Sequence, residues 1–452
     1  MLSQKKSFLS TYDTLETDPI PDPWEWLLRC TIIIGLFALF YAGLSGRLFQ
    51  PVLCASRTAS WLRIIIRPSL LWGAMGFLLL AFRTFLWFRY RSFLPAGIEE
   101  AQSLTVIIPA YNEGAMVEKS IDSAASATYL RDRLEIIVID DGSTDDTWQY
   151  IRHAARRYPG LVTPIRFPEN RGKRAALEAG VRQAHGEIIV TIDSDSIIEP
   201  DALLAIAGPF RNPSIGAVAG KVVVYNRREG IIPRMLHVRY MLSFDFLRAA
   251  QSTYGTVYCC PGALSAYRAS VVREVLDAWM HQTFLGEICT YGEDRSLTNF
   301  ILSCGYDTVY QRSAVVHTAA PVAYAKLCKM YLRWDRSYVK EEIRFARIVW
   351  KRPLISRIIA LLDVFITNLR YPVSYAVLIM LAVMTLDDPT TILRLFFAIG
   401  LMSLLNVFYY LRSERSWDFI YGVFYSYFSF FTLFWIFPYA VLTVRSRSWM
   451  TR

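Results

Sequence analysis

Two carboxylates stand two residues apart, directly after an apolar run. The run 188–192 (IIVTI) is rich in β-branched residues, which is typical of a buried strand, and Asp193 and Asp195 follow it. In an extended chain these two side chains point to the same side, roughly 7 Å apart, where their charges repel. A hard divalent cation that also binds substrate phosphates relieves this repulsion. The spacing therefore predicts a Mg²⁺ or Mn²⁺ site at Asp193 and Asp195, with a solvated turn as the alternative.

Polar side chains also follow two other apolar runs. Asp140 and Asp141 end the run LEIIVI, and Tyr111 and Glu113 come just after LTVIIPA. In open α/β sheets, ligands bind beyond the carboxyl ends of the strands. Helix capping explains each polar end taken singly. Because three strand ends share this feature, we favour one ligand site at a common edge of a sheet.

The elements around these residues divide the 452-residue chain into an apolar beginning, a mixed centre and an apolar end. The chain is 54% hydrophobic and only 19% charged, which is more apolar than an ordinary soluble protein. Apolar stretches of about 20 residues are long enough to cross a bilayer, so we expect a multi-pass membrane protein. The expected parts are a polar N-terminal segment (1–25), two transmembrane helices (26–90), an α/β domain (100–336), amphipathic interfacial helices (337–370), C-terminal transmembrane helices (371–444) and a basic tail (445–452).

The central part alternates short β-branched runs with helix-like stretches. This alternation predicts a mostly parallel sheet with covering helices. The runs are continuously apolar, which suits strands that are buried on both faces. We therefore expect a Rossmann-like α/β domain between two groups of membrane helices.

Charge and cysteine usage narrow the class of protein. The net charge is +10, which basic residues beside membrane helices explain, with a positive site for an anionic substrate as a second interpretation. No basic helix interleaved with aromatic residues stands out, so we do not expect nucleic-acid binding. The seven cysteines are odd in number and form no CxxC pair, which argues against a disulfide framework or a zinc site.

Four motifs in the central part resemble a known family. VIIPAYNEG, VIDDGSTDDT, NRGKRAALEAG and TIDSDSIIEPDAL, in this order, resemble the nucleotide-sugar-binding half of family 2 inverting glycosyltransferases. The resemblance implies a GT-A fold, which is a Rossmann-like sheet with a DxD motif. It implies that Asp140 and Asp141 mark the base and ribose site, and that Asp193 and Asp195 hold the diphosphate through Mg²⁺ or Mn²⁺. The other nucleotide-sugar-binding residues that it implies are Tyr111, Glu113, Lys173 and Arg174.

Two later motifs resemble hyaluronan and chitin synthases in particular. CCPGALSAYR resembles their priming loop at Cys260 and Gly262, on the acceptor side, with a tight turn that leads into a strand as the alternative. GEDRSLTNFIL resembles their acidic pair followed by arginine, which implies that Asp294 is the general base, with Glu293 and Arg295 beside it. A base is needed because an acceptor hydroxyl is a poor nucleophile at neutral pH. A helix-capping acidic pair is the alternative.

YLRWDRSYVKEE resembles the QxxRW segment of the same synthases, with Met330 at the glutamine position. The resemblance implies that Arg333 and Arg336 bind the diphosphate through their bidentate forks. It also implies that Trp334 offers a flat face to an acceptor sugar. An aromatic anchor for an interfacial helix is the alternative for Trp334. The terminal WMTR resembles a tail of relatives at Trp449, Thr451 and Arg452.

The resemblance implies a membrane-embedded inverting β-glycosyltransferase. It would polymerise sugars from a UDP-sugar donor onto a growing polysaccharide and extrude the product across the membrane. The branch implies UDP-N-acetylglucosamine, with UDP-glucuronate as a possible second donor. Two alternatives stay open: a non-processive transferase acting on a lipid carrier, and a transporter or channel with a regulatory nucleotide-binding domain. The sequence sets no oligomeric state.

The arginines of the N-terminal region bear on topology. Arg47, Arg57, Arg63 and Arg67 lie between the two expected N-terminal spans, and the positive-inside rule places such a loop in the cytoplasm. This loop and the α/β domain would lie on opposite sides of the second span, so the rule by itself would place the domain outside. UDP-sugars, however, are made in the cytoplasm. We therefore expect the α/β domain to face the cytoplasm from the cell membrane.

Overall fold

The computed structural model describes residues 23–44 and 62–446, and the chain divides into two compact units. The α/β unit comprises Tyr90–Arg357 together with the described residues from Phe434 onward. The helical unit comprises the described residues up to Arg89 and Ile358–Leu433. The expected tail residues Trp449, Thr451 and Arg452, and the loop residues Arg47 and Arg57, lie outside the described residues.

An eight-stranded mixed sheet forms the core of the α/β unit, in the order β3-β2-β1-β4-β7-β6-β10-β5. The strands β1, β2, β3 and β4 are parallel, and β7 is inserted antiparallel between β4 and β6. The apolar runs of β1, β2 and β4 are almost fully buried, as continuous β-branched runs predict. The strands are β1 Leu104–Ala110, β2 Leu134–Asp140, β3 Val162–Arg166, β4 Ile188–Thr191, β5 Ile197–Ile198, β6 Ile215–Val224, β7 Ser265–Arg268 and β10 Asp307–Thr318.

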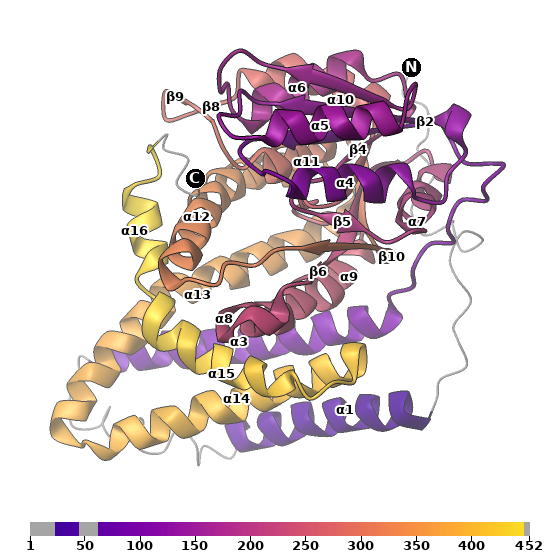
Figure 1. Ribbon diagram of the computed structural model, residues 1–452. Helices are drawn as coiled ribbons and strands as arrows, with labels where there is room; N and C mark the ends of the chain where they lie inside the picture. Colours follow the sequence, from indigo (N-terminus) through magenta and orange to yellow (C-terminus); the bar gives the residue numbers. More distant parts are fainter. Residues whose placement is uncertain (1–22, 45–61, 447–452) are drawn as a thin grey trace. The chain divides into compact units, whose positions relative to one another are not determined.

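Amphipathic helices cover this sheet and join its strands. Helices α4 and α5 lie side by side, and α6 packs on β1 and β2 and against α10 (Figure 1). A short hairpin of β8 and β9 separates α10 from α11. These elements are α4 Met116–Ala125, α5 Thr147–Arg157, α6 Lys173–Gln183, α7 Ala202–Ala207, α10 Ala269–Met280, β8 Thr283–Phe284, β9 Glu287–Ile288 and α11 Glu293–Ser303. This mixed sheet with covering helices confirms the predicted GT-A class of fold.

A second group of helices completes the α/β unit. The long helix α12 packs against α11 and against α16. Tyr338 of α12 meets Phe437 of α16 edge to face, with 6.5 Å between the ring centroids. The helices of this group are α8 Ile231–Met241, the π-helix η6 Leu242–Arg248, α9 Ala249–Ser252, α12 Tyr324–Ile348 and α16 Ile436–Leu442.

The remaining helices are long and apolar. Among the described residues, three are long and apolar enough to cross a membrane: Ser69–Arg89, Leu354–Leu386 and Thr390–Glu414. A bent pair, Phe419–Leu433 with Ile436–Leu442, adds a fourth if it counts as one span, and Trp26–Ala38 is a shorter apolar helix. These helices support a multi-pass membrane protein. Their elements are α1 Pro23–Leu44, α3 Leu62–Arg89, α13 Leu354–Asp387, α14 Thr390–Glu414 and α15 Phe419–Phe428.

Helix α13 differs from the sequence expectation. Residues up to 370 were expected to belong to interfacial helices, but α13 runs without interruption through this position to Asp387. Its charged residue Asp363 is only 4% exposed and pairs with Arg83 of α3, whose Nη2 lies 2.7 Å from its Oδ1. Arg83 also donates to the Thr367 hydroxyl at 2.7 Å. Because the charges of an apolar helix bundle are satisfied by pairing, the helix continues past them.

Candidate active site

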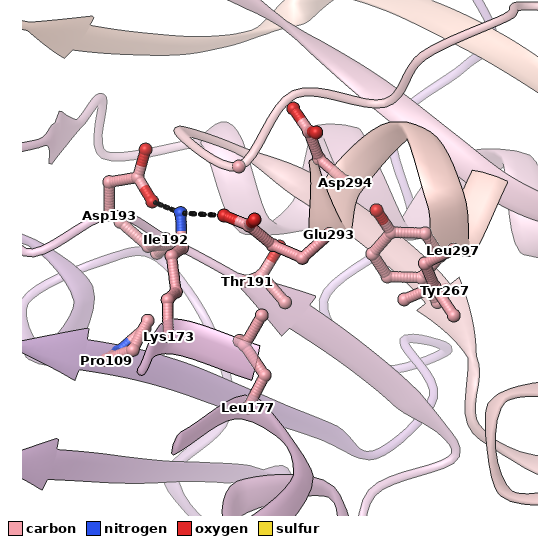
Figure 2. A pocket seen from close by; sticks show the side chains of 11 residues that line it. Pro109, Lys173, Leu177, Thr191, Ile192, Asp193, Tyr267, Glu293, Asp294 and Leu297 are labelled. Atoms are coloured by element: carbon pink, nitrogen blue, oxygen red, sulfur yellow. Dashed lines mark hydrogen bonds and ion pairs between the residues drawn. The ribbon is translucent and has the colours of Figure 1, made fainter. Parts of the chain in front are cut away.

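A small pocket lies where the carboxyl ends of β1 and β4 meet the first turn of α11 (Figure 2). Its walls come from strand ends, from the start of α6, from the loop before β7 and from α11. The first and last of the lining residues, Pro109 and Leu297, are 188 positions apart in the sequence, and the mixed sheet brings the segments together. The lining residues are Pro109, Lys173, Leu177, Thr191, Ile192, Asp193, Gly262, Tyr267, Glu293, Asp294 and Leu297.

The amine of Lys173 lies between two carboxylates at the centre of this pocket (Figure 2). Its Nζ donates to Oδ1 of Asp193 and lies 3.3 Å from Oε1 of Glu293. Burial lowers the pKa of Lys173, but Asp193 and Glu293 outweigh it, so the pKa is raised. Lys173 therefore carries a fixed positive charge. Its amine joins the strand end at Asp193 to the start of α11 at Glu293.

Glu293 and Asp294 are adjacent carboxylates in different electrostatic environments. Burial raises the pKa of Glu293, but Lys173 and Arg333 outweigh it, so that Glu293 stays ionised with a pKa below its ordinary value. Burial and the charge of Glu293 raise the pKa of Asp294. Its Oδ1 accepts from the amide of Arg295 at 2.7 Å, and the thiol of Cys259 lies 3.6 Å from its Oδ2. Such a split in pKa is typical of an acid–base pair with separate roles.

This split predicts the pH dependence of the reaction if Asp294 is the base. The base acts only when ionised, so activity is present above its pKa and is lost as the pH falls through it. Because that pKa is raised, the acid limb of kcat lies above the ordinary aspartate value of about 3.9. Glu293→Gln removes the neighbouring charge and is expected to move the acid limb of the remaining activity to lower pH. UDP release measured across pH checks this, with UDP binding at each pH as the control; an unmoved limb contradicts it.

Asp195 lies beside this pocket and does not line it. It is half-buried, and its Oδ1 is 3.3 Å from the hydroxyl of Ser196 and 3.5 Å from that of Thr318. Burial, followed by the charge of Asp193, raises the pKa of Asp195 to about 6. Asp193 and Asp195 together therefore carry more negative charge than the surrounding groups neutralise.

The strand-end aspartates offer a partial set of ligands for the predicted cation. Among the described residues, no three His, Cys, Asp or Glu side chains converge as a complete protein metal site. Asp193 and Asp195 do offer carboxylate oxygens, which Mg²⁺ and Mn²⁺ prefer, and Mg²⁺ commonly takes only one or two carboxylates together with substrate phosphates. The two aspartates thus fit a cation whose remaining ligands come from a bound diphosphate.

Asp140 and Asp141 are buried at the end of β2, and they organise loops. Oδ1 of Asp140 accepts from the amide of Ser143 at 3.0 Å. The two oxygens of Asp141 accept from the amides of Arg171 and Gly172 at 2.8 and 2.9 Å. Asp141 thus fixes the loop that leads into Lys173, a function that the sequence motif did not reveal.

A second hollow lies next to these aspartates and extends the site along the sheet edge. It is lined by Gly142, Ser143, Arg166, Phe167 and Pro168. Arg166 pairs with Asp140 at 3.1 Å and stacks on the ring of Trp148 at 5.4 Å. Arg166 is the last residue of the short strand β3 and Phe167 follows it; neither was predicted, because this strand is short and partly polar.

The side chain of Glu113 connects two strand ends. Its Oε1 accepts from the hydroxyl of Ser194, between the two aspartates of the DxD motif, at 2.9 Å. Tyr111 is half-buried at the end of β1. Both predicted residues therefore lie at the same edge as Asp193.

Arg174 does not face the pocket beside Lys173. It is 5% exposed, its Nη1 donates to the carbonyl of Trp279 at 2.8 Å, and its guanidinium carbon lies 4.9 Å from the Trp279 ring centroid. Its guanidinium contacts the carbonyl and the ring of Trp279, and so it is not available to bind a phosphate in the pocket. The reason is helical geometry, because neighbouring residues on a helix point about 100° apart.

Two residues of the priming-loop motif contact the site: Gly262 lies beside Lys173 and Asp193, and Cys259 lies beside Asp294. Cys260 is fully buried and its amide donates to Thr298 at 3.0 Å, while the thiol of Cys259 is the one that faces Asp294. A Cβ on Gly262 would lie 2.8 Å from Nζ of Lys173 and 3.1 Å from Oδ1 of Asp193. A Cβ at this position would therefore push the amine of Lys173 away from its place beside Asp193.

Gly262→Ala is expected to lower activity at least about tenfold, because a misplacement of the site by a fraction of an ångström is enough to slow an oriented reaction. The measurement is UDP release by the purified variant. Gly73→Ala is the matched control, since a Cβ at this glycine meets nothing within 4 Å. Equal activity of the two variants would contradict the close-approach interpretation.

The predicted residues of α12 separate into different environments. Trp334 is 41% exposed, and its ring meets those of Tyr331 and Tyr240 with centroid distances of 5.5 and 6.2 Å. Arg333 acts electrostatically on Glu293, as the lowered pKa of Glu293 indicates. Arg336, in contrast, is 3% exposed and donates through Nη2 to the Thr443 hydroxyl at 2.8 Å. The structure therefore places Arg336 in a helix contact rather than at the diphosphate site.

Arg295 likewise binds within the protein. Its Nη2 pairs with Glu342 of α12, and its guanidinium lies over the ring of Tyr338 at 4.6 Å. Met330, at the position of the motif glutamine, is 9% exposed and belongs to the core.

The chain resembles several known proteins. Residues 105–276 match the family model described as Glycosyl transferase family 2. An N-acetylglucosaminyltransferase of Azorhizobium caulinodans is 31% identical over 363 residues, which is 79% of this chain and 90% of that protein. A hyaluronan synthase of Streptococcus pyogenes serotype M1 is 32% identical over 258 residues, which is 56% of this chain and 61% of that protein.

A solved structure supports the fold. A mannosyltransferase from Pyrobaculum calidifontis, solved with GDP-mannose and Mn²⁺, matches 80% of this chain and 99% of its own chain, with a TM-score of 0.58 and 22% identity. The predicted resemblance to hyaluronan-synthase-like enzymes is thus confirmed, and a transporter without transferase chemistry is ruled out. This chain belongs to the family 2 glycosyltransferases.

Proposed function

We propose that this enzyme is a membrane-embedded inverting β-glycosyltransferase that polymerises sugars from a UDP-sugar donor. The observation that carries the proposal is the convergence of Asp193, Lys173, Glu293 and Asp294 on one pocket at the carboxyl edge of the sheet. Relatives named N-acetylglucosaminyltransferase and hyaluronan synthase support UDP-N-acetylglucosamine as the first donor to test, with UDP-glucuronate as a second.

In the proposed reaction, the acceptor hydroxyl attacks the anomeric carbon as the UDP leaves from the opposite face. Asp294 accepts the hydroxyl proton, and its raised pKa makes it a stronger base than an ordinary aspartate. Lys173 offers a fixed positive charge close to the leaving diphosphate. Asp193 and Asp195 would hold the divalent cation, which supplies charge neutralisation on the leaving group when it is bound.

The apolar helices support the membrane part of the proposal. At least three of the described helices are long enough to span a bilayer, and because the proposed donor is made in the cytoplasm, we propose that the α/β unit faces that side. The exposed ring of Trp334 suits stacking on an acceptor sugar. We propose that elongation itself moves the product across the membrane.

The alternative is a non-processive transferase that modifies a lipid carrier. One experiment separates the two: the purified enzyme is given UDP-sugars singly and in pairs, and both UDP release and product length are measured, with and without polyprenyl phosphate. Processive polymerisation is expected to give long products without the lipid. Single-sugar products that appear only with polyprenyl phosphate would favour the alternative, and absence of UDP release with every donor would contradict the proposed function.

A further inference from the structure

A buried hydrogen-bond network joins the helix that carries Asp294 to helix α12. At its centre is Glu341, a carboxylate that is only 3% exposed. Its Oε1 accepts from Nε2 of Gln282 at 2.6 Å, and its Oε2 accepts from Nδ2 of Asn299 at 2.8 Å. Each carboxylate oxygen thus accepts from the side-chain amide of a different segment: Gln282 lies in the turn between α10 and β8, and Asn299 lies on α11.

The network continues from Gln282 toward the donor side of the pocket. Its Oε1 accepts from the hydroxyl of Ser296, in the first turn of α11, and from both Nη atoms of Arg174 at 3.3 Å. Arg174 is the direct neighbour of Lys173 at the start of α6. One buried carboxylate is therefore connected to both helices that contribute charged groups to the pocket.

The direction of every hydrogen bond in this network follows from the residue types. Arg174 can only donate, so Gln282 must turn its oxygen toward the guanidinium and its NH₂ group toward Glu341. Asn299 also presents its NH₂ group to Glu341. The side chain at position 341 must consequently accept at both ends, which an ionised carboxylate does and an amide does not. A neutral amide would leave a buried donor facing a donor, or force Gln282 to turn over.

A steric contact fixes the same two helices one turn earlier. Gly292, the N-cap of α11, has a left-handed backbone with φ of 79°. A Cβ at this glycine would collide with the side chain of Ser337. Ser337 and Glu341 are four residues apart on α12 and so lie on one helix face. That face holds the first turn of α11 at Gly292 and the second turn at Asn299, with Glu293 and Asp294 between them.

We propose that Glu341 is a positioning residue for sugar transfer, which holds the first turn of α11 so that Asp294 and Glu293 meet Lys173 in the transfer geometry. This inference rests on the proposed role of Asp294 as the base. Glu341 does not touch the pocket, and acts through Gln282, Ser296 and Asn299.

Glu341→Gln is the direct test, because it keeps the size of the side chain and removes one acceptor and the charge. We expect kcat for transfer to fall about 10- to 100-fold, as for other small misplacements of a reacting group. The donor KM and the UDP affinity measured by calorimetry should change by less than about twofold, since the nucleotide site lies at the ends of β1, β2 and β4. Glu341→Asp, which keeps an acceptor-only carboxylate, should recover part of the lost kcat.

Glu274→Gln is the matched control, because Glu274 is an exposed residue of α10 outside the network, and it should keep wild-type kcat. Activities are divided by the number of UDP-binding sites, so that loss of folded protein is removed from the comparison. A wild-type kcat for Glu341→Gln, or a loss that disappears after this correction, would overturn the inference. So would a Glu341→Asp variant no more active than Glu341→Gln.

Two further variants separate this inference from the function on which it rests. Ser296→Ala combined with Glu341→Gln should reduce kcat by less than the product of the single effects, because both belong to one network; a full product would overturn the inference. Asp294→Asn is assayed in parallel. An active Asp294→Asn variant refutes the proposed base whatever Glu341 does, whereas an inactive Asp294→Asn beside a fully active Glu341→Gln refutes only the positioning role.

Discussion

Asp294→Asn is expected to abolish sugar transfer while UDP binding survives. The substitution keeps the shape of the side chain and removes its ability to take a proton. General-base catalysis contributes roughly 10²- to 10⁴-fold, so the variant should lose at least that factor in kcat. Because Asp294 lies on α11 and the strand-end aspartates lie on the sheet, the nucleotide site should be left intact.

The measurement pairs a UDP-release assay with calorimetric titration of UDP into the same purified variant. Asp277→Asn is a suitable control, since Asp277 is an exposed aspartate on α10 that pairs only with the exposed Arg182 in the contacts described. Wild-type turnover of Asp294→Asn would remove Asp294 from the mechanism. Loss of UDP binding together with activity would instead assign Asp294 to the fold of the site.

Strand positions were the part of the fold that the sequence predicted best. The apolar runs ending at Ala110, Asp140 and Thr191 are strands of the sheet, because β-branched residues in continuous runs have few other places to be buried. The antiparallel strand β7 was expected only under the alternative interpretation of CCPGALSAYR, a tight turn that leads into a strand. It has only four residues, SAYR, and no local pattern distinguishes such a segment from a loop.

The site was predictable in its members but not in the direction of its side chains. Lys173 and Glu293 are 120 positions apart, so only the folded sheet shows that they meet. Neighbours in sequence point to different places: Lys173 enters the pocket while Arg174 packs on Trp279, and Cys259 rather than Cys260 faces Asp294. A motif identifies a segment, whereas helix and strand geometry decides which of its residues reaches the ligand.

The membrane segments show the same difference between pattern and partner. The charged residues within 354–370 suggest an interfacial helix when they are considered alone. In the structure, Asp363 has the guanidinium of Arg83 as its partner, so its charge does not end the apolar helix. Hydropathy records the presence of a charge and carries no information about the residue that neutralises it.

Asp195→Ala is expected to remove the Mn²⁺-dependent part of UDP binding. Asp193 is already engaged by Lys173, so Asp195 is the carboxylate whose negative charge is least compensated in the pair. A cation held between this pair and a diphosphate would lose one of its two protein ligands. We expect UDP affinity in Mn²⁺ to fall at least about tenfold and to approach the affinity measured with a chelator, since ligand loss at a metal site has effects of 10-fold or more.

Calorimetric titration of UDP with Mn²⁺, and again with a chelator, measures this difference for wild type and variant. Asp201→Asn is the matched control, because Asp201 is an exposed aspartate six positions along the same segment. Undiminished Mn²⁺-dependent binding by Asp195→Ala would contradict a metal site at this strand end. Lys173 would then be the main positive charge available to the diphosphate, because it is the one cation among the residues that line the pocket.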